Sequence, residues 1–525
     1  MKKHSKELVL LLSLSAVATL SINLSNLYLI KKDNPDNIPL NARSTFQGVT
    51  VFSVDNEYYI TPPENFISGK GWKRTSLYQN SGEPAGKGGY FRRTPGYSLW
   101  YLLFRAFLPQ KTALLFLVSF QVIIFLLSVY CIFHLLLMLG LSRRARVLIT
   151  LIYGCAPWFS SNTFVTLTEA LSPYLVIFLV YFLFKAWFEV NPRKKLILYL
   201  ISSFFLGYSI LTRPYTGLAA ILLPDFLWRD YFAKQGFKFF AERALLVGLI
   251  PLLMLFTWAA RNYVVTGEVV ILEKDHYPES LDPIKPEFKA IWNFTKSWGA
   301  SHFWEYQTPL FVHVMSGETD NQKDIDLILN SFPDYVKRDF GEEKLRNLLM
   351  DYRNILLSQE KFYADGAPMP PFYTQEQLRL AQEWDSLTKE FRRKYPFQYY
   401  VIAPLKYLKR VVLHSNTSGL HIFQAAYRHI TPLNVLRYLL LALHVALYLN
   451  ILLRLFWLKE HSLLTFSSFV LLPLLLLAFF IFYYREIEQR YMLPYLPLLL
   501  LSFSLTVEKL VKTIEKLVKN GVGYL

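Results

Sequence analysis

The sequence predicts an all-α polytopic membrane protein with about ten transmembrane helices and a mainly helical periplasmic domain. Apolar runs of the roughly 20 residues that a transmembrane helix needs recur towards both ends of the chain. Hydrophobic residues make up 53% of the 525 residues, which is enough to supply that many helices. Basic residues gather in the short segments between the apolar runs, as is typical of cytoplasmic loops.

The first apolar run covers residues 7–30 and follows Met1-Lys-Lys-His-Ser-Lys6. It is longer than the core of a signal peptide and has no small-x-small cleavage site before Lys31. We therefore expect a retained anchor with a cytoplasmic N-terminus.

Length and charge then predict the topology. Arg143, Arg193, Lys238 and Lys509 each belong to a basic cluster next to an apolar run, and these clusters all fall on the cytoplasmic side if ten runs span the membrane. The ten expected spans are 7–30, 112–139, 147–164, 171–190, 197–212, 215–229, 244–262, 433–457, 463–484 and 492–508.

Two local interpretations decide this alternation. Residues 95–109 are too few to cross a bilayer and include Arg105, so they predict an interfacial or re-entrant helix on the outer face. The apolar region 197–229 breaks at Arg213-Pro214, because proline cannot continue a helix. Arg213 is then expected at the outer end of a hairpin.

Two hydrophilic segments are expected outside the membrane, at residues 31–110 and 265–432. Long segments cross largely regardless of their charge. The chain therefore divides into a transmembrane module (1–264), a mainly helical periplasmic domain (265–432) and C-terminal helices with a cytoplasmic tail (433–525). Amphipathic, charge-rich stretches at 319–358 and 374–393 predict helices in the outer domain.

Composition also limits the chemistry. The formal net charge of +17 orients the loops rather than indicating a nucleic-acid partner. Cys131 and Cys155 are the only cysteines and both lie in apolar runs, so neither a disulfide framework nor a cysteine metal site is expected. The histidines lack metal-ligand spacing, and no cofactor is indicated.

Acidic residues next to apolar runs are the candidate catalytic groups. Asp55 and Glu57 follow the first run, and Glu169 lies at the outer turn between two later runs. A carboxylate there serves as a general base towards an acceptor hydroxyl. Each residue also has a simpler interpretation: Asp55 and Glu57 as solvated loop acids, and Glu169 as an acid that the helix dipole favours at a helix start.

Basic residues at the same outer edge are the candidate substrate-binding groups, because guanidinium suits phosphate. A single interfacial arginine more often reaches a lipid headgroup, but several together favour a site. The set comprises Arg92 and Arg93 after a glycine-rich stretch, Arg213, Arg261 with Tyr263, and Arg490 with Tyr491.

The order of these segments resembles the C-type (GT-C) integral-membrane glycosyltransferases, in particular bacterial relatives of protein O-mannosyltransferases and the aminoarabinose transferase. The resembling segments are Asp55-Asn-Glu57-Tyr-Tyr, Arg93-Thr-Pro-Gly-Tyr97, Thr168-Glu169, Leu211-Thr-Arg-Pro214, Trp258-Ala-Ala-Arg-Asn-Tyr263 and Gln489-Arg-Tyr-Met-Leu-Pro494. The resemblance covers about residues 1–270 and 463–508, and residues 265–432 have no counterpart.

The resemblance implies an inverting transfer of a sugar from a polyprenyl-phosphate donor to a glycan, lipid or protein acceptor, in the bacterial inner membrane with the site facing the periplasm. It implies that Asp55 is the catalytic base, Glu169 a second outer carboxylate, and Arg92 or Arg93 a group near the lipid phosphate. Family members often have adjacent Asp-Glu, whereas Asn56 stands between the acids here, so Glu57 stays a candidate for the role. Some members bind a divalent metal and others do not, which leaves metal use open.

Two other functions compete. A lipid-linked oligosaccharide polymerase or ligase shares the lipid phosphate and relies on basic residues in a large outer loop. A non-catalytic lipid or sugar transporter is expected to show inverted repeats and charges at mid-membrane, and the sequence shows neither.

Overall fold

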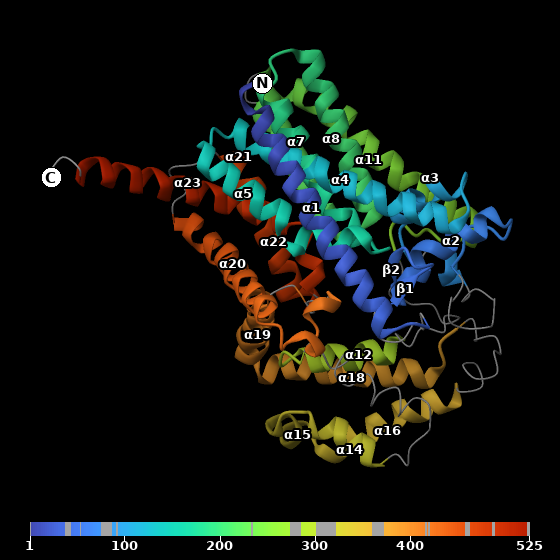
Figure 1. Cartoon of the computed structure of the whole chain (residues 1–525). Coiled ribbons are helices and arrows are strands. Elements are labelled where there is room, and N and C mark those ends of the chain that lie inside the picture. The colour runs from blue at the N-terminus through green and yellow to red at the C-terminus, as the bar shows by residue number, and fades with distance from the viewer. Residues whose placement is uncertain are drawn as a thin grey trace.

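The computed structural model describes residues 2–36, 44–52, 54–74, 87–90, 93–232, 235–273, 285–300, 322–359, 372–414, 417, 420–456, 463–485 and 489–521. Long helices form a bundle, and a layer of shorter helices lies against one end of it (Figure 1). The N-terminus of the chain lies at the opposite end of the bundle. The protein is therefore an all-α membrane protein with a helical domain at one end.

Seven helices among the described residues are long and apolar enough to cross a membrane. They run over Ser5–Asp33 in α1 (Lys2–Asp33), Gln110–Met138 (α4), Thr168–Phe188, which includes α7 (Ser172–Phe188), Pro192–Thr212 (α8), Phe237–Thr266 (α11), Thr431–Phe456 (α20) and Leu463–Tyr484. The α7 stretch is the most buried of them and α11 the least, so α7 is central and α11 peripheral.

The three other predicted spans take less regular forms. Helix α5 (Arg143–Cys155) has only 13 residues and continues into α6 (Pro157–Ser160). Residues 214–232 form the short segments η5 (Pro214–Ile221), α9 (Leu222–Leu227) and η6 (Trp228–Phe232). Helix α23 (Leu496–Gly521) becomes charged from Glu508 onward. The number ten thus stays a prediction.

The predicted break at Arg213-Pro214 is present. Helix α8 ends at Thr212, and Arg213 adopts an extended backbone conformation before η5. Because Pro214 has no N–H group, the helical hydrogen bonds cannot continue through it.

The first outer segment forms a small layer beside the bundle. Strands β1 (Ser44–Phe46) and β2 (Thr50–Phe52) pair antiparallel, and α2 (Glu57–Ile67) follows. The predicted short helix is α3 (Gly96–Arg105), and the Arg105 Nε lies 2.9 Å from Oε1 of Glu64 on α2. Because Arg105 pairs with Glu64, its charge is neutralised inside the protein and does not have to face lipid.

The segment 265–432, called the outer domain after its predicted side of the membrane, has a hydrophobic cluster of its own among residues 288–391. Its helices are α12 (Pro286–Lys296), α14 (Gln322–Asn330), α15 (Asp334–Phe340), α16 (Glu342–Ser358) and α18 (Gln375–Lys394). The stretches predicted as helical, 319–358 and 374–393, coincide with α14–α16 and α18. Phe294 and Trp384 pack ring to ring, 5.4 Å apart, between α12 and α18.

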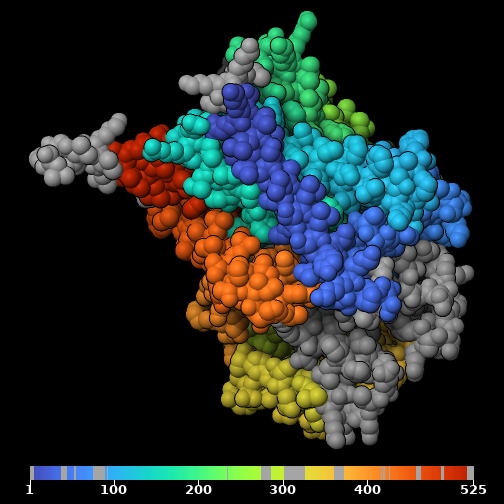
Figure 2. Space-filling view, in the orientation of Figure 1, coloured from blue at the N-terminus to red at the C-terminus, as the bar shows by residue number. Residues whose placement is uncertain are grey.

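The outer domain contacts the bundle through α19 (Ala403–Val412) and through η12 (Phe479–Tyr484), which follows α22 (Leu472–Ala478). The Tyr407 hydroxyl donates to the Lys296 carbonyl at 3.0 Å, and the Lys296 ammonium donates to the Tyr484 carbonyl at 3.2 Å. On the visible face, residues of the outer domain and the start of α20 lie directly below the bundle (Figure 2).

Candidate functional site

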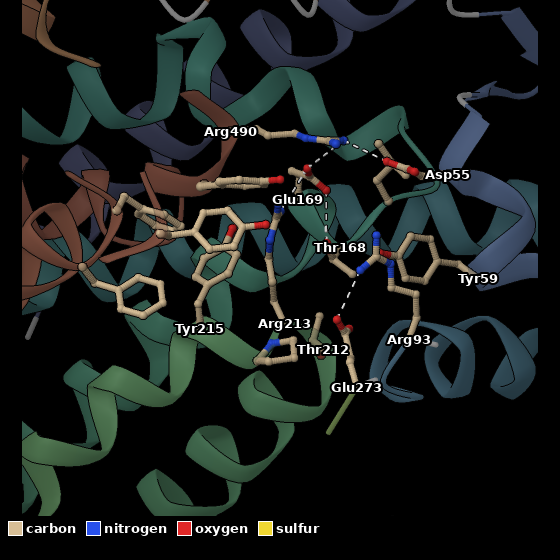
Figure 3. A pocket seen from close by; sticks show the side chains of 16 residues that line it. Asp55, Tyr59, Arg93, Thr168, Glu169, Thr212, Arg213, Tyr215, Glu273 and Arg490 are labelled. Atoms are coloured by element: carbon tan, nitrogen blue, oxygen red, sulfur yellow. Dashed lines mark hydrogen bonds and ion pairs between the residues drawn. The ribbon is translucent and has the colours of Figure 1, made fainter. Parts of the chain in front are cut away.

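A cavity of about 390 Å³ lies where the ends of several apolar helices meet (Figure 3). Three arginines and three carboxylates line it among the residues that the structure describes. Each lies in a short segment between longer elements, and these segments are far apart in sequence. The charged residues are Asp55, Glu169, Glu273, Arg93, Arg213 and Arg490.

Asp55 and Arg490 form the outer pair of the cavity. Asp55 lies in a single turn, η1 (Val54–Asn56), between β2 and α2, and Arg490 lies in η13 (Gln489–Met492), just before α23. The Arg490 Nη1 is 3.1 Å from the Asp55 Oδ2 and 3.5 Å from the Glu169 Oε1. One guanidinium thus bridges two carboxylates, and the Asp55 side chain keeps 26% of its surface exposed.

Glu169 and Arg213 form the inner pair, and both are buried. The Arg213 Nη1 lies 3.0 Å from the Glu169 Oε1, but neither atom has a hydrogen-bond partner of good geometry among the described residues. The contact is therefore an ion pair without a well-formed hydrogen bond. Burial disfavours the Arg213 cation, yet Glu169 holds the pKa of Arg213 above its ordinary value.

Arg93 and Glu273 form a third pair on the other side of Asp55. The Arg93 Nη1 is 3.2 Å from the Glu273 Oε2. Burial disfavours the Arg93 cation, but Glu273 keeps the pKa of Arg93 above its usual range. Tyr59 lies beside Arg93 in Figure 3, and burial raises the pKa of Tyr59 to about 12, so its hydroxyl stays protonated at neutral pH.

A close contact between the backbones of α3 and α8 brings Arg93, which precedes α3, and Arg213, which follows α8, to the same cavity. Gly96 begins α3 against the end of α8, and a Cβ atom at Gly96 would lie 2.5 Å from the Leu211 carbonyl carbon. The Tyr208 hydroxyl also donates to the Gly96 carbonyl at 2.9 Å. Only glycine permits such an approach.

Aromatic rings form the wall opposite the acids. They belong to Tyr215, Phe479, Phe480, Tyr484 and Tyr491. The Arg213 guanidinium lies over the Tyr215 ring at 4.8 Å and the Tyr491 ring at 5.5 Å. An apolar wall facing a few convergent charged groups is the usual composition of a small-molecule site.

The structure brings six of the residues predicted from sequence together in this cavity, namely Asp55, Arg93, Glu169, Arg213, Arg490 and Tyr491. Glu57 lies elsewhere: it is buried and pairs with Arg74. Arg261 donates to the Trp72 carbonyl at 2.5 Å and the Tyr90 carbonyl at 2.7 Å, so it fastens the first outer segment. Tyr263 is 57% exposed and does not line the cavity. Arg92 lies outside the described residues.

Among the described lining residues, the sequence analysis assigned no role to Glu273 or to the aromatic residues Tyr59, Tyr215, Phe479, Phe480 and Tyr484. Glu273 carried a usable signal, since it is an acid soon after the apolar run that ends near Arg261. Tyr59 and Tyr215 carried none, because tyrosines are frequent along the whole chain.

Among the described residues, no group of three or more His, Cys, Asp or Glu side chains has the arrangement of a metal site. The acids of the cavity contact arginines instead. Searches against protein-family models, curated proteins and solved structures found no match to this chain.

Proposed function

We propose that the chain is a GT-C-like integral-membrane glycosyltransferase that moves a sugar from a polyprenyl-phosphate donor to an acceptor hydroxyl, with inversion. The observation that carries the proposal is the meeting of Asp55 and Glu169 with Arg93, Arg213 and Arg490 in one cavity at the ends of apolar helices. A donor with a lipid tail and a phosphate needs cations at that depth, because its phosphate lies at the interface.

The proposed reaction is one displacement at the anomeric carbon. The acceptor oxygen forms a bond to that carbon as the bond from carbon to the phosphate oxygen breaks. The bonding electron pair leaves with the polyprenyl phosphate, whose charge Arg213 and Arg490 stabilise. The acceptor proton passes to Asp55 as general base. Sugar, lipid phosphate and proton are all accounted for without a nucleotide.

Asp55 suits the base role better than Glu57 or Glu169. Glu57 does not reach the cavity, and Glu169 is buried between two arginines at 3.0 and 3.5 Å. Asp55 contacts one arginine and is the more exposed acid of the Asp55–Glu169 pair. We assign Glu169 the task of orienting Arg213 and Arg490.

The proposal includes the predicted topology: ten spans, both termini in the cytoplasm and the cavity on the periplasmic face of the inner membrane. A cysteine introduced at Glu376, on the outer domain, is expected to react with an impermeant thiol reagent added to intact cells. A cysteine at Lys194 is expected to react only after lysis. The unaltered chain, with Cys131 and Cys155, serves as background, and the reverse pattern would contradict the topology.

The activity test uses the full chain purified in lipid nanodiscs with a panel of polyprenyl-phosphate sugars. We expect release of polyprenyl phosphate from at least one donor, with water as the acceptor of the sugar, and Asp55→Asn is the inactive control. Cleavage of polyprenyl-diphosphate oligosaccharides alone would favour the polymerase or ligase. In sealed vesicles, movement of donor without cleavage would favour the transporter.

A further inference from the structure

A second pocket of about 330 Å³ lies between the outer domain and the helix bundle. Its walls come from α12, α18, η7 (Gln398–Ile402) and the end of η12. We call it the outer pocket. Tyr484 lines both the outer pocket and the cavity that holds Asp55, so the two adjoin at this side chain.

Positive charge predominates in the outer pocket. Four cations line it, Lys296, Lys389, Arg392 and Arg485, against the single carboxylate of Asp385 among its described lining residues. The cations come from three separate elements, α12, α18 and the end of η12. Their convergence is therefore a product of the fold and not of one basic stretch.

Arg485 and Lys296 are the buried members of this set, and Arg485 has the more unusual geometry. It is 6% exposed and adopts a left-handed backbone conformation (φ 53°, ψ 35°), which residues other than glycine rarely do. Its Nη2 donates to the Tyr399 carbonyl at 2.9 Å. Its Nη1 has no hydrogen-bond acceptor among the residues that the structure describes. A buried guanidinium donor without an acceptor is costly, and an anion would satisfy it.

Two arginines flank one tyrosine in this pocket. The Arg485 guanidinium lies 3.5 Å from the centre of the Tyr399 ring and that of Arg392 lies 4.9 Å from it. Neither arginine has a carboxylate at ion-pair distance within the described part of the chain. Burial, and the Arg392 cation to a lesser extent, lower the pKa of Arg485. An anion bound in the pocket would offset both effects on Arg485.

We propose that the outer pocket binds a phosphate or carboxylate group of the acceptor, while the acceptor hydroxyl lies in the cavity beside Asp55. That the bound molecule is an acceptor rests on the proposed glycosyl transfer, whereas the presence of an anion site rests on the residues of the outer pocket alone. The site selects acidic acceptors over neutral ones, because Arg485 and Arg392 gain a partner only from an anion.

The test measures binding without turnover, on the full chain purified in phosphatidylcholine nanodiscs. The probes are a hexose 6-phosphate, a hexuronate and the uncharged hexose, followed by isothermal titration. We expect the acidic probes to bind more tightly than the hexose. Arg392→Gln and Arg485→Gln are each expected to weaken binding of the acidic probes about tenfold, the loss of a charged hydrogen bond.

Arg393→Gln is the matched control, because Arg393 neighbours Arg392 on α18 but is exposed and does not line the pocket. It is expected to leave binding unchanged. Arg392→Gln alone is decisive if Arg485→Gln fails to fold, since Arg392 is exposed.

Equal binding of charged and uncharged probes, or equal losses in Arg392→Gln and Arg393→Gln, would overturn the inference. Loss of hexose-phosphate binding in phosphatidylglycerol nanodiscs would also overturn it, by making a lipid headgroup the occupant. Failure of donor cleavage, with arginine-dependent binding retained, would contradict the proposed function and leave the anion site standing.

Discussion

Among the described lining residues, three arginines face three carboxylates in the cavity, whereas four cations face one carboxylate in the outer pocket. Paired charges hold one another in place, which suits a site where new charge develops during a reaction. An excess of cations among the described lining residues instead favours an anion from outside, which suits a site that selects a ligand. The difference supports the proposed division, in which the cavity performs the transfer and the outer pocket selects the acceptor.

The sharpest test of this division is Asp55→Asn. Base catalysis contributes about 100- to 10,000-fold, so turnover is expected to fall by that factor, with the protein folded and the donor still bound. The measurement is kcat for donor cleavage, with donor binding followed separately.

Glu57→Gln is the matched control for Asp55→Asn, because Glu57 pairs with Arg74 away from the cavity. It is expected to change stability more than kcat per folded molecule. Normal turnover in Asp55→Asn beside an inactive Glu57→Gln would move the base to Glu57. Normal turnover in both, and in Glu169→Gln, would exclude a carboxylate base from this cavity.

Arginines from the two regions are expected to fail in different ways. Arg490→Gln removes a cation that bridges Asp55 and Glu169, and we expect kcat to fall about 100- to 1,000-fold for every acceptor. Arg392→Gln is expected to raise KM for acidic acceptors and leave kcat near its original value.

Arg261→Gln tests whether Arg261 has a structural role, in contrast to the cavity residue Arg490. It is expected to loosen the contacts to Trp72 and Tyr90, and to lower stability rather than kcat. A loss of kcat in Arg261→Gln as large as that in Arg490→Gln would contradict the assignment of roles.

These roles show what the sequence could and could not predict. Charge at the ends of apolar runs pointed to Asp55, Glu169, Arg213 and Arg490, because such charge is costly and rarely accidental. Their pairing could not be predicted, since Asp55 and Arg490 are 435 residues apart and only packing brings them together.

Arg261 shows the limit of the same argument within one helix. Its place at the end of α11 was apparent from the hydrophobic run, but the direction of its side chain depends on what packs beside it. Helix α11 is peripheral, and Arg261 turns to the carbonyls of Trp72 and Tyr90. The apolar run 215–229 likewise predicted a span, and the structure breaks it into short segments after Pro214.

Gly96→Ala tests whether the contact between α3 and α8 supports the cavity but not the outer pocket. The new Cβ would collide with Leu211 and Thr212, which forces α3 and α8 apart. We expect a loss of about 1–3 kcal/mol in stability, typical of overpacking. Donor cleavage is expected to fall while binding of hexose 6-phosphate at the outer pocket persists. Equal loss of both would show that the two sites depend on one packing arrangement.

A buried carboxylate in each region extends the comparison. Glu169 has two arginines within 3.5 Å. Glu287 is fully buried on α12, and one of its oxygens accepts from the Gln377 amide at 2.9 Å. Its other oxygen has no hydrogen-bond partner among the described residues. Burial raises the pKa of Glu287 above its ordinary value near 4.5. The folded chain therefore favours the protonated acid more than the unfolded chain does. Its contribution to stability is fully present below pH 4.5 and is lost as the pH rises through the raised pKa.

Glu287→Gln is accordingly expected to stabilise the outer domain at pH 8 by about 1 kcal/mol, because it removes a buried charge and keeps an amide for Gln377. Hydrogen exchange in peptides from α12 and α18 is expected to slow about fivefold at pH 8. The difference from the unaltered chain is expected to shrink towards pH 4, where Glu287 is protonated in both states. Glu376→Gln, on the exposed face of α18, controls for a change of charge alone. Faster exchange in Glu287→Gln at every pH would show that the outer domain, like the cavity, pairs its buried acid with a cation.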